Sequence, residues 1–176
     1  DVNLSPVQKV ARLLHAASNP YKLFREYQWP RGWGKRFTDP KLSTKLEWVR
    51  KKIVEALTRK EKVVVGTGIY IEGVTRPVDA ADPETLWVGG LLQQWFGKDK
   101  VIILDGKVSA REDVDGLSQR DRLIERWRSD PDAQILLISM RTFPDSVDLT
   151  VKRQAGVKRL FITTLSLGWK PWYQFL

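Results

Sequence analysis

The stretch that decides the fold is Gln134-Ile-Leu-Leu-Ile-Ser139-Met-Arg141-Thr-Phe-Pro-Asp145-Ser-Val-Asp148-Leu-Thr150. Its first half contains a continuous apolar run, which is typical of a β-strand buried on both faces of a parallel sheet. Its second half is a polar turn followed by a short amphipathic segment. In open α/β sheets the working loops follow the carboxyl ends of the strands. We therefore expect binding or chemistry at Ser139, Arg141, Asp145 and Asp148.

Apolar runs of the same kind recur along the chain and alternate with helical patterns. The predicted strands are 62–66, 101–104, 134–139 and 159–164. The predicted helices are 44–60, which begins with a capping-box pattern, 83–96, 118–128 and a short turn near 145–152. Such alternation predicts βαβ units, and hence an α/β fold with a mostly parallel sheet covered by helices on both faces.

The first 42 residues have a different character. They contain one predicted helix, 4–16, followed by an irregular aromatic and basic segment centred on Trp29-Pro30-Arg31-Gly32-Trp33-Gly34-Lys35-Arg36. Tryptophan interleaved with cations can stack on bases or line a phosphate groove, which makes Lys35 and Arg36 candidate DNA-binding residues. The tryptophans could equally hold an irregular loop on the core. We therefore divide the chain into a helical and basic N-terminal extension, 1–42, and an α/β domain, 43–176.

Positive charge is concentrated in one part of the chain. The formal net charge is +9, and residues 31–62 carry eleven Lys or Arg against four acids, whereas residues 63–130 carry nine against twelve. A concentrated basic segment favours a polyanionic partner, nucleic acid first. The alternative is a solvated charged face, and charge alone leaves both interpretations open.

Several classes of function are disfavoured by composition. The chain has no Cys and one His, His15, so disulfides, thiolate catalysis and a structural metal site are not expected. No apolar run approaches the ~18 residues of a membrane span, and no signal-peptide pattern opens the chain. We expect a soluble intracellular protein without a membrane partner, cytoplasmic in a bacterium or nuclear in a eukaryote.

One further motif follows a predicted strand, namely Gly66-Thr67-Gly68. A glycine pair in that position occurs in phosphate-binding loops, but the remaining spacing of a Walker A or dinucleotide fingerprint is missing. One hypothesis is therefore a self-contained doubly wound enzyme in which Gly66, Gly68 and Asp105 would be site residues.

The order of Ser139, Arg141, a turn, an apolar and a polar residue, then Leu149 and Thr150 resembles the fifth helicase motif of Swi/Snf-type ATPases of helicase superfamily two. The glycine-rich turn of that family is replaced here by Phe143-Pro144-Asp145-Ser146, and its Phe-Ser-Gln by Gly66-Thr67-Gly68. Other similar segments occur in the family's order: Leu13 to Pro20, Ser43 to Glu47, Lys62 to Val65, Leu104-Asp105-Gly106, Arg120 with Ile124 to Trp127, and Trp169-Lys170-Pro171.

The resemblance implies a RecA-like, three-layer αβα C-terminal lobe of an ATP-dependent DNA translocase over 43–176, ending before the sixth motif with its arginine fingers. It implies that Thr67, Ser139 and Arg141 face DNA phosphates. Asp145 and Asp148 would approach the nucleotide cleft, although Asp145 could instead cap a helix.

By the same resemblance, ATP and Mg²⁺ would be held mainly by a first lobe of the same polypeptide, so we expect no catalytic residue and no bound cofactor in this chain. The expected partners are double-stranded DNA and that first lobe, and the chain itself should be monomeric and inactive alone. The altered turns favour an alternative, a degenerate non-catalytic helicase-like module that binds DNA or protein.

Overall fold

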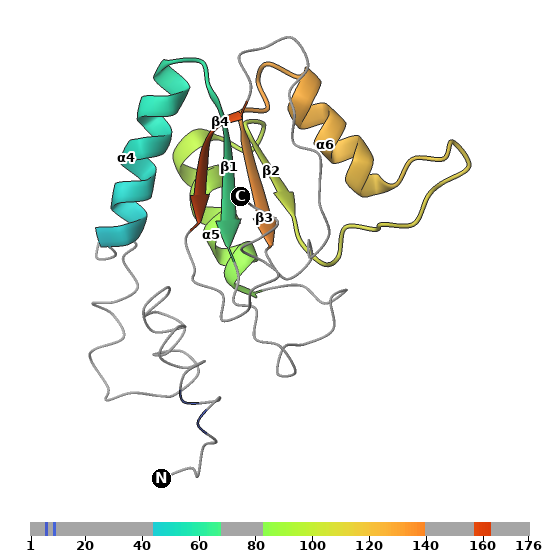
Figure 1. Ribbon diagram of the computed structural model, residues 1–176, viewed down its shortest axis with the longest axis horizontal. Helices are drawn as coiled ribbons and strands as arrows, with labels where there is room; N and C mark the ends of the chain where they lie inside the picture. Colours follow the sequence, from blue (N-terminus) through green and yellow to red (C-terminus); the bar gives the residue numbers. More distant parts are fainter. Residues whose placement is uncertain (1–5, 7–8, 10–43, 68–82, 140–156, 163–176) are drawn as a thin grey trace.

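A computed structural model describes residues 6, 9, 44–67, 83–139 and 157–162 of the chain. Within these ranges, three long helices and four strands follow one another along the chain, and Figure 1 shows their arrangement. They are α4 (Thr44–Thr58), β1 (Lys62–Thr67), α5 (Pro83–Phe96), β2 (Val101–Leu104), α6 (Gln119–Ser129), β3 (Ile135–Ser139) and β4 (Val157–Ile162). None of these helices is long and apolar enough to cross a membrane.

The four strands form one parallel sheet in the order β2-β3-β1-β4. From β1 the chain passes through α5 to β2, two positions away, and then returns through α6 to β3, which lies between them. The chain changes direction along the sheet at β2, and α5 and α6 cover opposite faces. Both crossovers therefore have the same hand, as the strong preference for right-handed connections requires.

Two apolar cores hold the helices on the sheet. On one face, α4 and α5 pack against alternate residues of β1 and β3, including Val63, Val65 and Leu137. On the other face, Ile124 and Trp127 of α6 pack against the intervening residues, such as Val64. Every residue of β1 and of β3 is buried, as expected for inner strands of a sheet covered on both sides. The result is an α/β fold with helices on both faces of a parallel sheet (Figure 1).

Most predicted elements are confirmed within a few residues. The helix predicted over 44–60 ends at Thr58, because the chain turns at Lys60, whose φ of 59° lies in the left-handed region. The helix predicted from 118 begins at Gln119, with Ser118 as its N-cap in a capping box with Asp121. β4 begins at Val157, two residues before its predicted start, because Val157 pairs with Lys62. Lys9 and Pro6 are helical, whereas the rest of 1–42 and the turn at 145–152 lie outside the described residues.

The adjacent glycines of α5 have different surroundings. A Cβ on Gly89 would lie 2.5 Å from Ile103 Cδ1 and 3.2 Å from Leu137 Cδ2, whereas nothing lies within 4 Å of one on Gly90. The absent side chain of Gly89 therefore lets α5 approach β2 and β3 closely.

Lys62 connects the start of β1 to the end of α6. Its side chain is buried, and Nζ donates hydrogen bonds to the main-chain oxygens of Trp127, Asp130 (2.6 Å) and Ala133 (3.1 Å). Nζ also lies 5.8 Å from the centre of the Trp127 ring. The last carbonyls of a helix lack intrahelical partners, and the ammonium group supplies donors at this point. Lys62 is therefore a structural residue, although it counts toward the basic segment 31–62.

Candidate functional site

The candidate site lies at the carboxyl edge, defined here as the edge of the sheet at which the strands end. Thr67 and Ser139, the last residues of β1 and β3, are paired in the register of the two strands. Leu104 pairs with Ile138, so Asp105 follows β2 at the level of Ser139. Three polar residues therefore follow one another across three adjacent strands.

The carboxyl ends of β1 and β3 also form the topological switch point of the sheet. The chain leaves β1 toward β2, at one end of the sheet. It leaves β3 toward β4, at the other end, so the two connections run in opposite directions. Open α/β sheets bind their ligands outside the strand ends where the connections diverge in this way. The structure thus brings Thr67 and Ser139 together where such a fold places a ligand.

Both hydroxyl residues lie on the face of the sheet that α4 and α5 cover. Side chains alternate between the two faces of a strand, and Val63 and Val65 pack on the α5 side, as do Ile135 and Leu137. Thr67 and Ser139 continue these two series. α5 connects β1 to β2, so its first turn, which contains the buried Thr85, starts from the carboxyl edge.

The row of polar residues is deeply buried. Thr67 and Ser139 are 0% exposed and Asp105 is 5% exposed. Thr67 Oγ1 has no hydrogen-bond partner among the described residues. A buried polar group without a partner costs about 1–3 kcal/mol. The Trp127 indole nitrogen is also unpaired within the described part, but it lies in the core beneath α6.

Asp105 has a local structural role. Its Oδ1 accepts a hydrogen bond from the Lys107 main-chain nitrogen at 3.0 Å, and its carbonyl accepts one from Val108 at 3.2 Å. These bonds form the turn that leaves β2, as Asp side chains commonly do. Its carboxylate would disfavour an anion close to β2, so a phosphate would fit the β1 and β3 part of the row better.

Two hydroxyls at the edge of the sheet from which α5 starts suit an anion. Hydroxyl groups donate hydrogen bonds to phosphate oxygens, and the N-terminus of a helix carries partial positive charge and free N–H groups. Because Thr67 and Ser139 are fully buried, a ligand would reach them only if the covering residues moved.

Gly66 is paired with both Ile138 and Ile162 inside the sheet, so it does not belong to a phosphate-cradling loop.

The remaining predicted site residues, Lys35, Arg36, Arg141, Asp145 and Asp148, lie outside the described residues. Sequence reasoning identified Thr67 and Ser139 singly, at the ends of two predicted strands. Their pairing depends on the order of the strands, which the sequence pattern did not predict. The roles of Lys62 and of the Asp105 turn were missed, and the only signal for the latter was an Asp-Gly pair directly after a strand.

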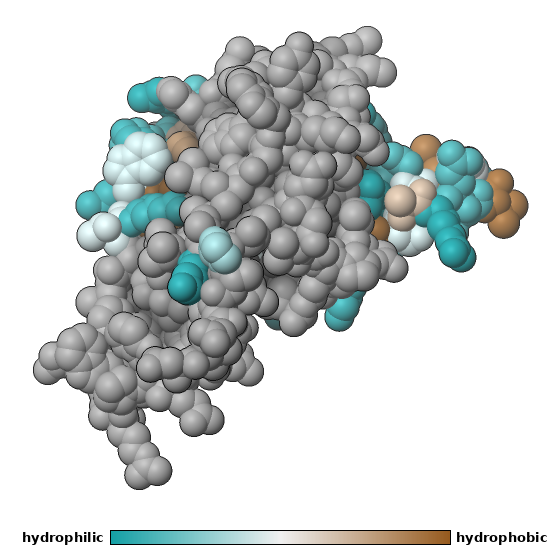
Figure 2. Space-filling view, turned by 60° about the horizontal axis from the view of Figure 1, so that its bottom comes forward, coloured by the Kyte–Doolittle hydropathy of each residue, from teal (hydrophilic) through white to brown (hydrophobic). Residues whose placement is uncertain are grey.

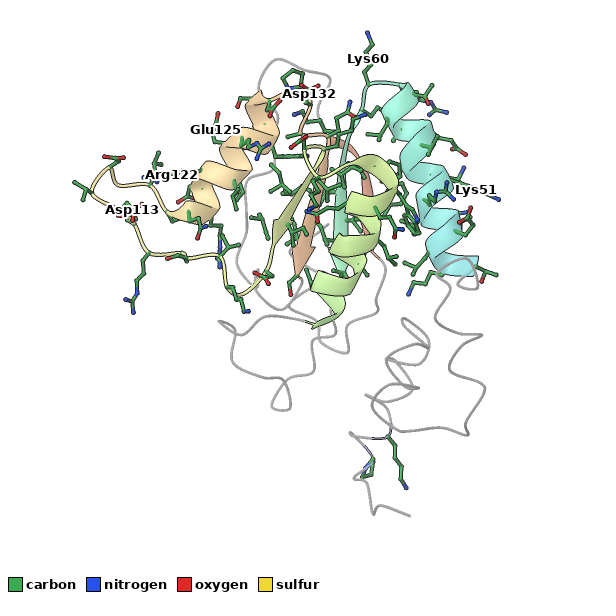
Figure 3. All side chains as sticks on the ribbon, turned by 180° about the vertical axis from the view of Figure 1, so that it is seen from behind. Lys51, Lys60, Asp113, Arg122, Glu125 and Asp132 are labelled. Atoms are coloured by element: carbon green, nitrogen blue, oxygen red, sulfur yellow. The ribbon has the colours of Figure 1, made fainter. Side chains whose placement is uncertain are left out.

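Within the basic segment, the described charges are mostly spread over the surface of α4. Arg50 pairs with Glu47 at 3.4 Å and lies 5.6 Å from the centre of the Trp95 ring, and Lys52 pairs with Glu55 at 2.7 Å. Lys51 and Lys60 are exposed and point away from the body of the molecule (Figure 3). This part of the segment forms a solvated face with some cations available to a partner.

Within the residues that the structure describes, no group of three or more His, Cys, Asp or Glu side chains could hold a metal ion. Comparison with known proteins adds no relative, since no family model, no curated protein and no solved structure matches the chain.

Proposed function

We propose that this chain is the DNA-contacting second lobe of a two-lobed ATP-dependent DNA translocase of the Swi/Snf type, with a RecA-like fold. The observation that carries the proposal is the pairing of Thr67 with Ser139 at the switch point of a parallel sheet. Two hydroxyls at that position suit a sugar-phosphate backbone, whose recognition needs no contact to base edges. The order of the helicase-like segments along the sequence supports the same assignment.

In this proposal the lobe binds duplex DNA through its backbone, without sequence preference. Thr67 and Ser139 donate hydrogen bonds to phosphate oxygens once the edge opens, and Arg141, two residues after Ser139, supplies a positive charge. ATP and Mg²⁺ are held by a first lobe, and Asp145 and Asp148 approach the nucleotide from this side. The chain by itself binds DNA weakly and hydrolyses no ATP.

The experiment compares duplex-DNA affinity across a series of salt concentrations for the wild-type chain and two variants. Arg141→Ala should weaken binding and reduce the slope of log K against log salt by about one, because one phosphate contact releases one counterion. Thr67→Val should weaken binding but leave the slope unchanged, because a hydroxyl carries no charge. Unchanged affinity in both variants would overturn the assignment of these residues.

A specific observation favours a second candidate, a non-catalytic helicase-like module that binds DNA or protein. Both hydroxyl residues are fully buried at the carboxyl edge, and β1 remains paired through Thr67. A closed edge of this kind suits a structural lobe. ATPase assays on a polypeptide that joins this chain to a first lobe and a finger helix distinguish the candidates. DNA-stimulated turnover that Arg141→Ala reduces supports the motor, whereas DNA binding without turnover supports the module.

A further inference from the structure

Two surfaces on opposite sides of the molecule expose apolar side chains that serve no function so far described. The first is the α4–β4 groove, a hollow of about 370 Å³ lined by Trp48, Lys52, Glu55, Ala56, Arg59 and Phe161. The second is the projecting loop, residues 109–118, between β2 and α6. Figure 1 shows the loop extending away from the sheet on the side opposite to α4.

The groove combines an aromatic floor with a basic rim. Trp48 is 55% exposed, and its ring meets Phe161 edge-to-face with the centroids 6.2 Å apart. Lys52 is paired with Glu55, whereas Arg59 makes no ion pair among the described residues. α4 carries four Lys or Arg against two Glu, and Arg59 follows it directly, so this wall of the groove is positively charged.

The projecting loop is a short hairpin held in one shape. Glu112 and Ser118 form an isolated antiparallel β-bridge, and the Asp113 N–H donates a hydrogen bond to the Leu117 carbonyl at 3.1 Å. Gly116 turns the chain with a φ of 72°. Arg122 of α6 pairs with both Asp113 (3.1 Å) and Asp115 (3.3 Å). Figure 3 shows the Arg122 side chain beside Asp113. Because these bonds favour one conformation of the loop before binding, they reduce the conformational entropy lost on binding.

The tip of this loop is apolar and its flanks are acidic. Val114 is fully exposed and Leu117 is half-exposed, and three carboxylates on 112–115 outnumber the guanidinium groups of Arg111 and Arg122. In Figure 2 the segment stands out from the body with hydrophobic and hydrophilic residues side by side. An apolar tip with acidic flanks complements an aromatic groove with a basic rim.

We propose that the α4–β4 groove binds the projecting loop of a second copy of this chain. The two surfaces lie on opposite sides of the molecule, so the loop of one copy cannot reach the groove of the same copy. Val114 enters the groove beside Trp48, and the loop carboxylates approach Arg59. The interface is head-to-tail and therefore open-ended, so copies can line up one after another. Three of the four large apolar side chains exposed in the described part, Trp48, Val114 and Leu117, are then covered, and Val54 is left free.

The test is sedimentation velocity on the nuclease-treated full chain, from about 10 µM to about 1 mM, because a contact this small should have a Kd on the order of 100 µM. The weight-average sedimentation coefficient should rise with concentration and fall when salt is added. Val114→Ser and Arg59→Glu should each weaken association at least tenfold. The control Val54→Gln lies on α4 outside the groove and should change nothing.

Mixing two variants tests the head-to-tail geometry. Arg59→Glu keeps an intact loop and Val114→Ser keeps an intact groove, so a mixture of the two should form a one-to-one dimer and no larger species. Thermal unfolding of each variant checks that both are folded, and both substituted side chains are exposed. Monomers at every concentration would overturn the proposal. So would association that Val54→Gln abolishes, or that only DNA induces.

Discussion

β1 carries a polar residue at each end, and the two ends differ in how their polar groups are satisfied. At the amino end, Lys62 donates to three carbonyls that α6 and the following turn would otherwise leave unpaired. At the carboxyl end, the Thr67 hydroxyl is equally buried and has no partner in the described part of the chain. Burial alone therefore does not separate a structural residue from a candidate binding residue. The hydrogen-bond partners do.

The largest effect on the free energy of unfolding should come from replacing Lys62, at the amino end of β1. Lys62→Met keeps the apolar stem but removes the donor, which leaves carbonyls of Trp127 and Ala133 buried without it. We expect a loss of about 2–4 kcal/mol in the free energy of unfolding, measured with urea. Lys60→Met, at an exposed neighbouring position, should change it by less than about 0.5 kcal/mol. Similar values for the two variants would mean that Lys62 does not hold α6.

The next largest effect on stability concerns α5, which covers the face of the sheet on which Thr67 lies. Gly89→Ala and Gly90→Ala gain the same helix propensity, but only the first places a methyl group against Ile103 and Leu137. Gly90→Ala should therefore be more stable than Gly89→Ala by about 1–3 kcal/mol, the usual range for overpacking a core. Thermal unfolding of both variants measures the difference. Equal melting temperatures would show that α5 can move away from the sheet at little cost.

A smaller effect, of opposite sign, is expected at the carboxyl end. Thr67→Val replaces a buried, unpaired hydroxyl by a methyl group of similar shape, so the free energy of unfolding should rise by about 1 kcal/mol. The same variant should bind DNA less well. Gained stability together with lost affinity is the signature of a group retained for binding. A loss of stability would instead indicate that the hydroxyl is satisfied in solution.

The smallest effect is a dependence on pH. Burial lowers the pKa of Lys62 below its ordinary value of 10.5, and the nearby Asp130 offsets only part of that shift. Between the lowered pKa and 10.5 the unfolded state binds more protons, so the stability of the wild-type chain should rise with pH in that window relative to Lys62→Met. Urea unfolding from about pH 8 upward tests this. If the stability of the wild-type chain relative to Lys62→Met fell as the pH rose, the result would contradict the burial of the Lys62 charge.

The sequence predicts the elements well where a single pattern dominates. The apolar spacing of Leu46, Val49 and Ile53 located α4, and the uninterrupted run of β3 located an inner strand. It does not predict the start of β4, because Val157 joins the strand through main-chain pairing with Lys62. It also gives no sign that Gly89 lies against the sheet, because the neighbours Ile103 and Leu137 come from the strands β2 and β3.

The candidate site is less accessible to sequence reasoning than the fold. Thr67 and Ser139 could each be placed at a strand end, but their pairing depends on the order of the strands. Lys62 looks like one cation of a basic segment, because its partners, Trp127, Asp130 and Ala133, lie far away along the chain. Long-range partners of this kind leave no periodic signal in the sequence.

The strand order also has a consequence for how the chain is made. β1 leaves the ribosome first among the described strands, yet it does not pair with β2, the next described strand to be synthesised. Val63 finds its partners at Ile135 and Arg159, after both crossover helices have been synthesised. The apolar Val63-Val64-Val65 segment therefore stays without a partner strand until β3 has been synthesised. The sheet then forms through non-local contacts, which slow folding and leave the nascent chain exposed to aggregation.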